Sequence, residues 1–447
     1  MYSRWANTNE YSNILTKIDL KKNIEKSGIQ MMYKGNDLYI DDSEAHSLVI
    51  GDTGSGKTQT IIFPLIKTAI NASESFIIND IKGEICKVTG DILKEKGYNT
   101  IIINLKNPNL GNNWNPLSLP YNIYKEGNKT EATKLLDNIG YYFFYDKTSM
   151  DPFWTNSATN YFVGLCLYLF EHAKEGEINL KSVFSLSNTI NEGKNLDDFI
   201  KKLDKNSSIY YNLSGTITAP IETRGGIIST FIEKLKKFLV SDELCSLLSY
   251  NDFDMSKIQD EKTAIFLITG INDYGNSLVP LFIDETIHAI DNNEKHDKRL
   301  NIILDDFETL DSIKDYTKLL SYSRGLNIRF TNLVKNLKGI NNIYGKENGE
   351  LLKLSFTNMI YLFSSDLDTV SEVSYLCGNI ESKNKIKPLI TPEELKVIDT
   401  FTAIILKQRM MPFKTKLLPD YKIDWNMSNT NYTIPKRDIK NIKIYKY

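Results

Sequence analysis

The sequence contains few cysteines and few histidines, and neither residue type forms a recognisable pattern. The cysteines Cys86, Cys166, Cys245 and Cys377 are widely separated, with no Cys-x-x-Cys pair, and the four histidines are equally scattered. This spacing argues against a disulfide framework, a zinc site and a histidine-based catalytic centre. A reducing cytosol fits such a chain better than an oxidising compartment.

A long apolar run is also missing. The most apolar stretch, Tyr161–Phe170, is about half as long as the roughly 20 residues that a membrane-spanning helix needs. The first residues, MYSRWANTNEYSN, lack the apolar core of a signal peptide. We therefore expect a chain that does not cross a bilayer by itself.

The chain carries no strong charge of either sign. Its formal net charge is −2 and its isoelectric point is about 6.2, so no overall basic field attracts nucleic acid. DNA binding is not excluded, because a ring that threads DNA needs only a locally positive lining. With 447 residues, 41% hydrophobic and 25% charged, the sequence predicts a globular protein of two or three domains.

Strand-length apolar runs recur in the first and last thirds of the chain. They are Ala45–Ile50, Ser75–Asp80, Asn99–Leu105, Thr263–Thr269, Leu300–Asp306 and Thr357–Phe363. Because these runs are continuous rather than alternating, they indicate strands buried on both faces, as in a mainly parallel sheet with helices between the strands. This pattern predicts a doubly wound α/β fold. Near the start, we expect a helix around Asn13–Ser27.

Between Asp151 and Asp254 the pattern changes, because apolar residues recur at spacings of three and four and no convincing strand appears. We predict an all-α domain at residues 151–254, inserted into the α/β domain. Residues 1–150 would form the first part of that domain, and residues 255–447 would form its second part.

One motif carries specific chemistry. The segment GDTGSGKT, Gly51–Thr58, matches G-x-x-x-x-G-K-[ST] and lies between a predicted strand and a predicted helix. Glycines let the backbone approach phosphate oxygens, and the N–H groups of the loop and of the helix start then bind them. Lys57 would neutralise the β- and γ-phosphates, and the Thr58 hydroxyl would coordinate Mg²⁺. The predicted ATP-binding residues are Gly51, Thr53, Gly54, Ser55, Gly56, Lys57 and Thr58.

Such a loop works with an acidic residue at the end of a neighbouring strand. LNIILDD supplies Asp305 as the candidate for Mg²⁺ and Asp306 as the candidate for orienting the attacking water. A solvated strand end is the alternative reading, and Asp80 is a weaker acidic candidate. Arg224, Arg324 and Arg329 are candidates for an arginine offered to a neighbouring subunit, although a surface salt bridge is at least as probable from the sequence alone.

Taken together, these segments resemble the coupling proteins of type IV secretion and conjugation. The resemblance rests on HSLVIGDTGSGKT, on Asp80–Lys82–Gly83–Glu84 in INDIKGEI, and on the WNPL that ends GYNTIIINLKNPNLGNNWNPL. It continues through DPFW, ILDDF, YSRGLNIRF, IYG and LITPEELKVI to MMPF, and RWANTNEY resembles the segment that opens the cytosolic part of those proteins.

The resemblance implies a recombinase-like ring ATPase, usually a hexamer, whose all-α domain recognises substrate. Such a protein docks relaxase-bound single-stranded DNA, or effector proteins, onto a secretion channel. Lys57, Thr58 and Asp305 match its nucleotide-site positions, and Arg324 aligns with the arginine offered across the subunit interface. We accordingly predict that Lys57, Asp305, Asp306 and Arg324 are catalytic, with ATP and Mg²⁺ as cofactors.

The sequence departs from that family in three respects. Members usually have transmembrane helices before the nucleotide domain, whereas this chain starts just after the point where they would end. We expect either a cytoplasmic member recruited to the inner face of the membrane by a partner, or a shortened chain. Asp306 stands where a glutamate is usual, and Lys335 stands where a glutamine is expected. Both changes bear on the rate of hydrolysis more than on nucleotide binding.

Two alternative functions follow from these departures and from the loop itself. One is a nucleotide-gated docking adaptor with little hydrolysis, which Asp306 and Lys335 favour. The other is a translocase that pumps double-stranded DNA, which the KGE and WNPL elements disfavour.

Two further segments need separate predictions. We expect Tyr141–Asp146, YYFFYD, to be packed rather than to stack on bases, and we expect Ile434–Tyr447 to be a solvated terminal segment.

Overall fold

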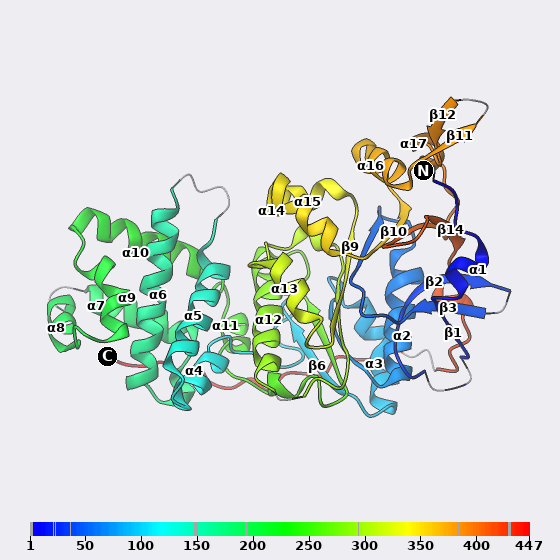
Figure 1. Ribbon diagram of the computed structural model, residues 1–447. Helices are drawn as coiled ribbons and strands as arrows, with labels where there is room; N and C mark the ends of the chain where they lie inside the picture. Colours follow the sequence, from blue (N-terminus) through cyan, green and yellow to red (C-terminus); the bar gives the residue numbers. More distant parts are fainter. Residues whose placement is uncertain are drawn as a thin grey trace. The chain divides into compact units, whose positions relative to one another are not determined.

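A computed structural model describes the chain except for residues 1–2, 21, 23, 36, 147–150, 193–194, 294, 383–384 and 428–430. The chain divides into two units (Figure 1). The first, here called the sheet unit, comprises Met1–Thr100, Lys257–Leu267 and Asn293–Thr433. The second, the helical unit, comprises Ile101–Ser256, Ile268–Asn292 and Ile434–Tyr447. β6 (Asn99–Asn104) carries the chain from the sheet unit into the helical unit.

A mainly parallel sheet forms the core of the sheet unit, as the continuous apolar runs predicted. In spatial order its strands run β14-β13-β10-β4-β9-β8-β5-β7. From β10 to β7 neighbouring strands pair in parallel, whereas β13 pairs antiparallel with both β10 and β14. The strands are β4 (Ser47–Gly51), β5 (Ser75–Asn79), β7 (Thr263–Ile268), β8 (Leu300–Leu304), β9 (Ile328–Val334), β10 (Asn358–Phe363), β13 (Thr402–Lys407) and β14 (Phe413–Lys416).

Helices and short strands complete the sheet unit. The helices are α1 (Thr8–Ser12), α2 (Phe63–Ala72), α3 (Glu84–Glu95), α13 (Tyr316–Ser323), α14 (Leu337–Tyr344), α15 (Lys346–Ser355), α16 (Leu367–Cys377) and α17 (Pro392–Lys396). β1 (Thr16–Ile18), β3 (Asp37–Asp41) and β2 (Ile29–Lys34) form a small antiparallel sheet, and β11 (Asn379–Ser382) pairs with β12 (Lys385–Pro388).

The predicted helix around Asn13–Ser27 is wrong. The structure has the short helix α1 before this segment and strand β1 within it. β1 pairs with β3 through Thr16 opposite Ile40 and Ile18 opposite Leu38. Ile18 then packs in an apolar cluster with Ile40 and Trp425. Pairing with a strand and burial against residues far along the chain override the local helical pattern.

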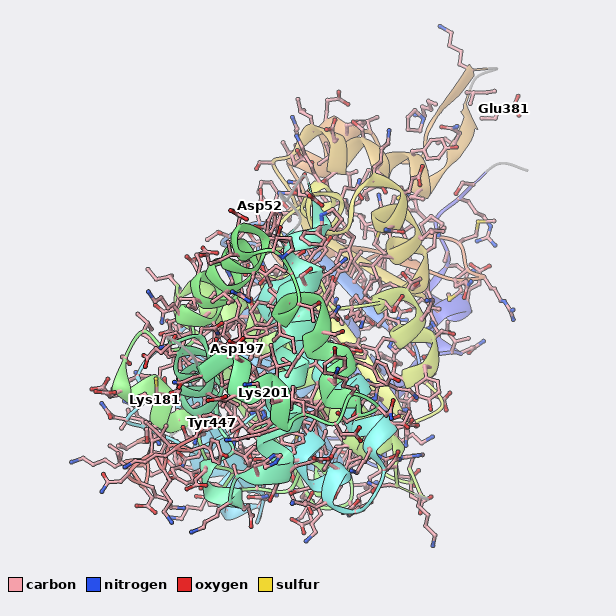
Figure 2. The ribbon with its side chains drawn as sticks, turned by 90° about the vertical axis from the view of Figure 1, so that its left-hand side faces the viewer. Asp52, Lys181, Asp197, Lys201, Glu381 and Tyr447 are labelled. Atoms are coloured by element: carbon pink, nitrogen blue, oxygen red, sulfur yellow. The ribbon has the colours of Figure 1, made fainter. Side chains whose placement is uncertain are left out.

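Helices make up the helical unit in its described residues. They are α4 (Ser118–Lys125), α5 (Lys129–Phe144), α6 (Pro152–His172), α7 (Leu180–Asn191), α8 (Asn195–Lys202), α9 (Ser208–Ile217), α10 (Ile221–Lys236), α11 (Asp242–Leu247) and α12 (Asp273–Asp291). Charged side chains such as Asp197 and Lys201 are exposed on this unit (Figure 2). No helix in the described part of the chain is long and apolar enough to cross a membrane.

Three aromatic residues of Tyr141–Asp146, namely Tyr142, Phe143 and Phe144, are packed in the helical unit, as expected, whereas Tyr145 is 52% exposed. Phe143 and Phe144 are fully buried and contact the rings of Phe162, Phe231 and Phe238. Side chains with these positions cannot stack on a nucleic-acid base without unfolding the core.

The segment Ile434–Tyr447 is largely exposed, as predicted, but it is anchored to the rest of the helical unit. Arg437 is only 4% exposed, and its guanidinium donates to Asn113 Oδ1 and to Ser246 Oγ at 3.1 Å. Further along, the ring of Tyr447 contacts the ring of Phe199. A buried arginine needs partners from the rest of the fold, and its charge alone could not reveal them in the sequence.

His46, immediately before β4, predicts a dependence of stability on acid. Its Nε2 bonds Leu320 O at 2.7 Å, and its Nδ1 accepts the Phe330 N–H at 3.0 Å. Burial lowers the pKa of His46 to about 4, so between pH 6.5 and 4 the unfolded chain binds a proton that the folded chain excludes. Stability therefore falls as pH falls through this window, by about 3 kcal/mol for this group when fully expressed.

Urea unfolding of the parent chain and of His46→Asn, from pH 7 to pH 4, measures this contribution. Asparagine does not titrate, so the loss of unfolding free energy with acid should be smaller in the variant. Parallel losses in the two proteins would contradict the assignment.

Candidate nucleotide-binding site

Gly51–Thr58 forms the loop between β4 and the helix that follows, as predicted. Gly54 and Gly56 have φ angles of +83° and +93°, which side-chain-bearing residues rarely adopt. The Ser55 N–H donates to Asp52 O at 3.1 Å, closing the turn. Lys57 is 9% exposed and its ammonium donates to Gly51 O, so the cation lies folded back over the loop.

The helix after the loop starts with a π turn, η1 (Thr58–Ile62), before α2 begins at Phe63. Pro64 explains this irregularity, because its ring has no N–H to donate to the carbonyl four residues earlier. That carbonyl, Thr60 O, instead accepts from Gln30 Nε2 at 2.8 Å. The π turn therefore leaves no unpaired carbonyl at Thr60 in the core. The first N–H groups of the helix face the loop.

The carboxylates of Asp305 and Asp306 follow directly after strand β8. Burial, reinforced by the charge of Asp306, raises the pKa of Asp305 to about 6, although nearby Lys57 acts in the opposite direction. The Asp306 N–H donates to Asp305 Oδ1 at 3.0 Å. Asp306 itself has a φ of +46°, a left-handed conformation that aspartate tolerates better than most residues. Two carboxylates this close favour a cation between or beside them.

Lys335 lies beside Asp306. Its ammonium is 3.5 Å from Asp306 Oδ2 and 4.0 Å from Glu308 Oε1. The two residues that depart from the family pattern therefore form an ion pair with each other. The sequence shows both departures but not their contact, because Lys335 follows β9 and Asp306 follows β8.

A cavity of about 430 Å³ joins these elements within the sheet unit. Its lining includes the loop residues Lys57 and Thr58, the carboxylates Asp305 and Asp306, and the aromatic side chain of Phe401. Phe401, in the turn before β13, was missed by sequence reasoning because nothing near it in the chain marks a nucleotide site. The cavity therefore brings the predicted acids together with most of the predicted loop residues, while Gly51 and Ser55 do not line it.

Asp80, the weaker acidic candidate, also lines this cavity but is already engaged by the backbone. Its carboxylate accepts the N–H groups of Gly83 at 3.0 Å and of Cys86 at 2.8 Å, at the start of α3. Gly83 has a φ of +77°, which permits the tight turn. The Asp80–Glu84 motif therefore builds a helix cap at the edge of the cavity.

The cavity suits Mg²⁺ only together with a phosphate ligand. In the described residues, no group of three or more His, Cys, Asp or Glu side chains is placed to hold a metal ion. The Thr58 hydroxyl and the Asp305 carboxylate supply oxygen atoms of the kind Mg²⁺ prefers, and phosphates and water usually complete its shell. Both residues line the same cavity, so the donor set fits a magnesium–nucleotide complex.

Arg324 does not reach this cavity. It precedes β9, whereas the phosphate loop follows β4, and these two strands pair in parallel through Ser47 opposite Thr331. The arginine therefore lies at the amino edge of the sheet, about 20 Å from the carboxyl edge for a strand of this length. Its Nη2 donates to Ser355 O at 3.1 Å, while Nε has no partner among the described residues.

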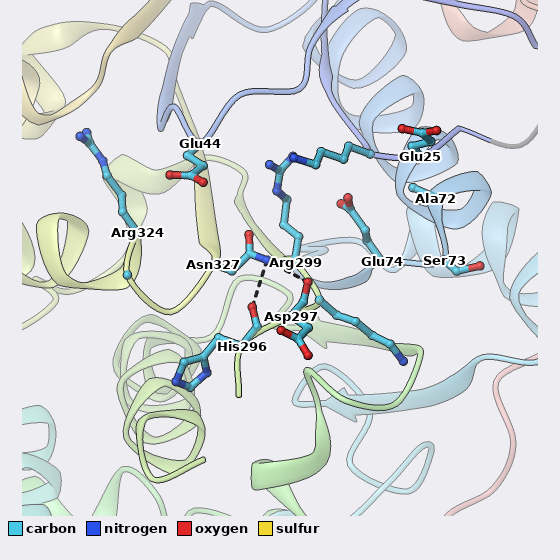
Figure 3. Close-up of a pocket in the computed structure, with 13 residues that line it drawn as sticks. Glu25, Glu44, Ala72, Ser73, Glu74, His296, Asp297, Arg299, Arg324 and Asn327 are labelled. Atoms are coloured by element: carbon cyan, nitrogen blue, oxygen red, sulfur yellow. Dashed lines mark hydrogen bonds between the residues drawn. The ribbon is translucent and has the colours of Figure 1, made fainter. Parts of the chain in front are cut away.

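A second cavity, of about 500 Å³, lies at this amino edge (Figure 3). Arg324 lines one side of it, opposite Glu25 and Ser73. Asn327 Nδ2 donates to the carbonyls of His296 at 3.2 Å and Asp297 at 3.3 Å, which fixes the turn into β9. Arg324 is thus available to another molecule and not to its own chain's phosphate loop.

The other two arginine candidates have different surroundings. Arg329 is 3% exposed and donates to Asn301 Oδ1 at 2.5 Å and to Ser27 Oγ at 2.9 Å. Burial lowers the pKa of Arg329 to about 10, and its role is to join β9 to β8 and the Ser27 loop. Arg224 lies on α10 of the helical unit. Of the three, Arg324 lines one of the two cavities described here, and Arg224 and Arg329 line neither.

Parallel sheet, phosphate loop and strand-end carboxylates together define a P-loop nucleotide-binding protein. Comparison with known sequences narrows this class. The family described as type IV secretory system conjugative DNA transfer matches residues 4–385. The chain belongs to this family.

Individual relatives agree with that membership. VirD4 of Agrobacterium fabrum is 21% identical over 417 residues, which cover 85% of this chain and 59% of that protein. VirD4 of Rhizobium rhizogenes is 20% identical, with the same coverage of both chains. This chain thus spans about three fifths of the length of the VirD4 proteins that it matches.

A solved structure shares the fold. The bacterial conjugative coupling protein TrwBdeltaN70, in its unbound monoclinic form, superposes with a TM-score of 0.73 at 15% identity, covering 98% of this chain and 96% of its own. The plasmid coupling protein TrwB, in complex with ADP and Mg²⁺, gives the same TM-score and identity, covering 98% of this chain and 97% of its own. The predicted α/β fold with a mainly parallel central sheet is confirmed.

Gly51 tests the packing of the loop. A Cβ atom there would lie 2.3 Å from Ser55 Oγ and 3.0 Å from Lys57 Cγ. Because these contacts are too short, Gly51→Ala should lower the unfolding free energy by about 1–3 kcal/mol, measured by urea titration. The double variant Gly51→Ala/Ser55→Gly, which removes the closest atoms, should regain part of the loss. No loss in the single variant would refute this packing.

Proposed function

We propose that this protein is an ATP hydrolase that couples a DNA substrate to a type IV secretion or conjugation channel. The observation that carries the proposal is the joint lining of one cavity by Lys57, Thr58, Asp305 and Asp306. Family membership supports the coupling role. We further propose that the substrate is single-stranded DNA with its relaxase, or a protein, and that the chain works as a homo-hexamer.

Each cavity residue has a defined part in this reaction. On binding, the Lys57 ammonium leaves Gly51 O for the β- and γ-phosphate oxygens, because an anion attracts it more strongly than a carbonyl. Thr58 and Asp305 would hold a magnesium ion, which would neutralise charge on those phosphates. Asp306 lies one residue further and would orient the attacking water. The positive φ of Asp306 sets the direction of that side chain.

Arg324 completes the site from a second copy of the chain. It lines a cavity at the opposite edge of the sheet from the phosphate loop, so one chain cannot bring both to the same phosphate. In a ring of identical subunits, the amino edge of one sheet would face the carboxyl edge of the next. An arginine supplied in this way typically accelerates phosphoryl transfer 10³- to 10⁵-fold.

Location and partners follow from the same proposal. The chain would act on the cytoplasmic side of a bacterial membrane and contact proteins of the secretion channel. A family named for DNA transfer and a structural neighbour named for conjugative coupling support the role of such a channel.

Two single variants, Lys57→Ala and Arg324→Ala, test the composite site when they are assayed separately and as a mixture. ATP turnover is measured with and without single-stranded DNA, and with duplex DNA in parallel. Each variant alone should be nearly inactive. An equal mixture should regain about one quarter of parental turnover, because half the subunits retain Lys57 and half their neighbours retain Arg324.

A mixture as inactive as its components would show that Arg324 is not shared between subunits. The absence of Lys57-dependent turnover in the parent chain would refute the hydrolase. Preferential stimulation by duplex DNA would replace the coupling role with a double-stranded DNA pump.

The ion pair between Lys335 and Asp306 favours a second candidate, a nucleotide-gated docking adaptor. The Lys335 ammonium lies 3.5 Å from Asp306 Oδ2 and competes with the attacking water for that carboxylate. Hydrolysis would then be slow while the phosphate loop still binds ATP. Tight binding of ATP with turnover no faster than that of free ATP distinguishes this adaptor from the motor.

Lys335→Gln measures how strongly the pair restrains hydrolysis. Glutamine removes the cation and should increase turnover several-fold, because the Asp306 carboxylate is then free to contact the attacking water. The unfolding free energy should change by about 1 kcal/mol or less, because the pair is partly exposed. Lys338→Gln, on the exposed side of α14, is the matched control. A fall in turnover for Lys335→Gln alone would show that Lys335 itself assists the reaction.

A further inference from the structure

The nucleotide cavity has an aromatic wall that phosphate chemistry does not use. Phe401, in the turn between α17 and β13, lines the cavity together with Thr400. Its ring lies against the phosphate loop, since a Cβ atom added at Gly56 would be 3.1 Å from Phe401 Cε1. Phe401 is half-buried, so part of the side chain remains open to a ligand. The residue lies outside the segment that the family matches, residues 4–385.

Sheet topology places this ring opposite the carboxylates. β13 lies two strands from β4 on one side, and β8 lies two strands from β4 on the other. Because β13 runs antiparallel to β10, its first residue is at the same edge as the last residues of β4 and β8. The cavity therefore has Asp305 and Asp306 on one flank, the phosphate loop in the middle and Phe401 on the far flank.

A bound nucleotide fits between these two flanks of the cavity in one orientation. Its terminal phosphate and the magnesium must face Asp305 and Thr58. The sugar and base then extend from the other end of the phosphate chain, away from β8 and toward β13. An aromatic ring at that position meets the face of the base, and stacking of this kind favours the larger purine rings over pyrimidines.

The backbone of Phe401 indicates that its position is maintained at a cost. Its φ angle is +65°, a conformation unfavourable for a bulky side chain. Two hydrogen bonds hold the turn, from the Thr402 N–H to Asp399 O at 3.0 Å and from the Leu417 N–H to Phe401 O at 2.8 Å. Strain of this kind persists where the surrounding structure enforces it and is concentrated at ligand sites.

We propose that Phe401 is the stacking platform for the base of the bound nucleotide and gives the site a preference for purine over pyrimidine triphosphates. This inference rests on the proposed nucleotide function. It adds a residue that recognises the base to a loop that recognises only the phosphates. The platform reads the face of the base, so ATP and GTP are both accommodated by it.

Titration calorimetry with the full chain tests the platform, using Mg–ATP, Mg–CTP and Mg–tripolyphosphate as probes. Phe401→Ala should bind Mg–ATP about tenfold more weakly than the parent, within the range for loss of one base–aromatic stack. Mg–tripolyphosphate, which has no base, should bind both proteins equally. Phe401→Trp should retain the ATP affinity, and the preference for ATP over CTP should shrink in Phe401→Ala. Tyr375→Ala, at an 80% exposed aromatic position on α16, is the control for loss of a surface ring.

The possible results separate this inference from the function on which it rests. Equal weakening of Mg–ATP and Mg–tripolyphosphate in Phe401→Ala would overturn it, by showing that the ring only supports Gly56. Unchanged ATP affinity in that variant would also overturn it, while leaving the nucleotide site intact. If the parent chain bound neither probe, the proposed function itself would fail.

Discussion

Parallel pairing of β4 with β9, and of β9 with β8, is the constraint on which the nucleotide site depends. Parallel strands end at a common edge. The loop after β4, the carboxylates after β8 and Lys335 after β9 are therefore brought together although they lie far apart in the sequence. The same geometry excludes Arg324, which precedes β9 and must lie at the other edge. The antiparallel strand β13 reverses the rule once, and its first turn brings Phe401 back to the site.

Under the proposed function, the site would bind within one chain and be completed by two. Lys57, Thr58 and Asp305 would hold a magnesium–triphosphate complex from within the chain. Acceleration of phosphoryl transfer would depend on a further cation, and the candidate, Arg324, lies about 20 Å away along the strands. The ion pair of Asp306 and Lys335, 3.5 Å apart, would restrain the carboxylate proposed to orient the water. Different residues would then govern binding and turnover.

The sequence predicts the local parts of this account and misses the parts that depend on distant contacts. The phosphate loop is a contiguous motif, and β8 is a continuous apolar run, so Lys57 and Asp305 were both identified. β9 was not recognised as a strand, because Arg329 and Asn332 interrupt its apolar pattern and find buried partners only in the fold. Arg437 and Phe401 were missed for the same reason. Neither the burial of a charged side chain nor a positive φ at an aromatic residue can be recognised from the neighbouring sequence.

Turnover per chain, measured against protein concentration at saturating Mg–ATP, tests most directly whether the site is shared between subunits. If Arg324 must come from a neighbour, turnover per chain should be near zero in dilute solution and rise steeply to a plateau as subunits assemble. A turnover per chain that is high and independent of concentration, in a protein shown by light scattering to remain monomeric, would contradict the account.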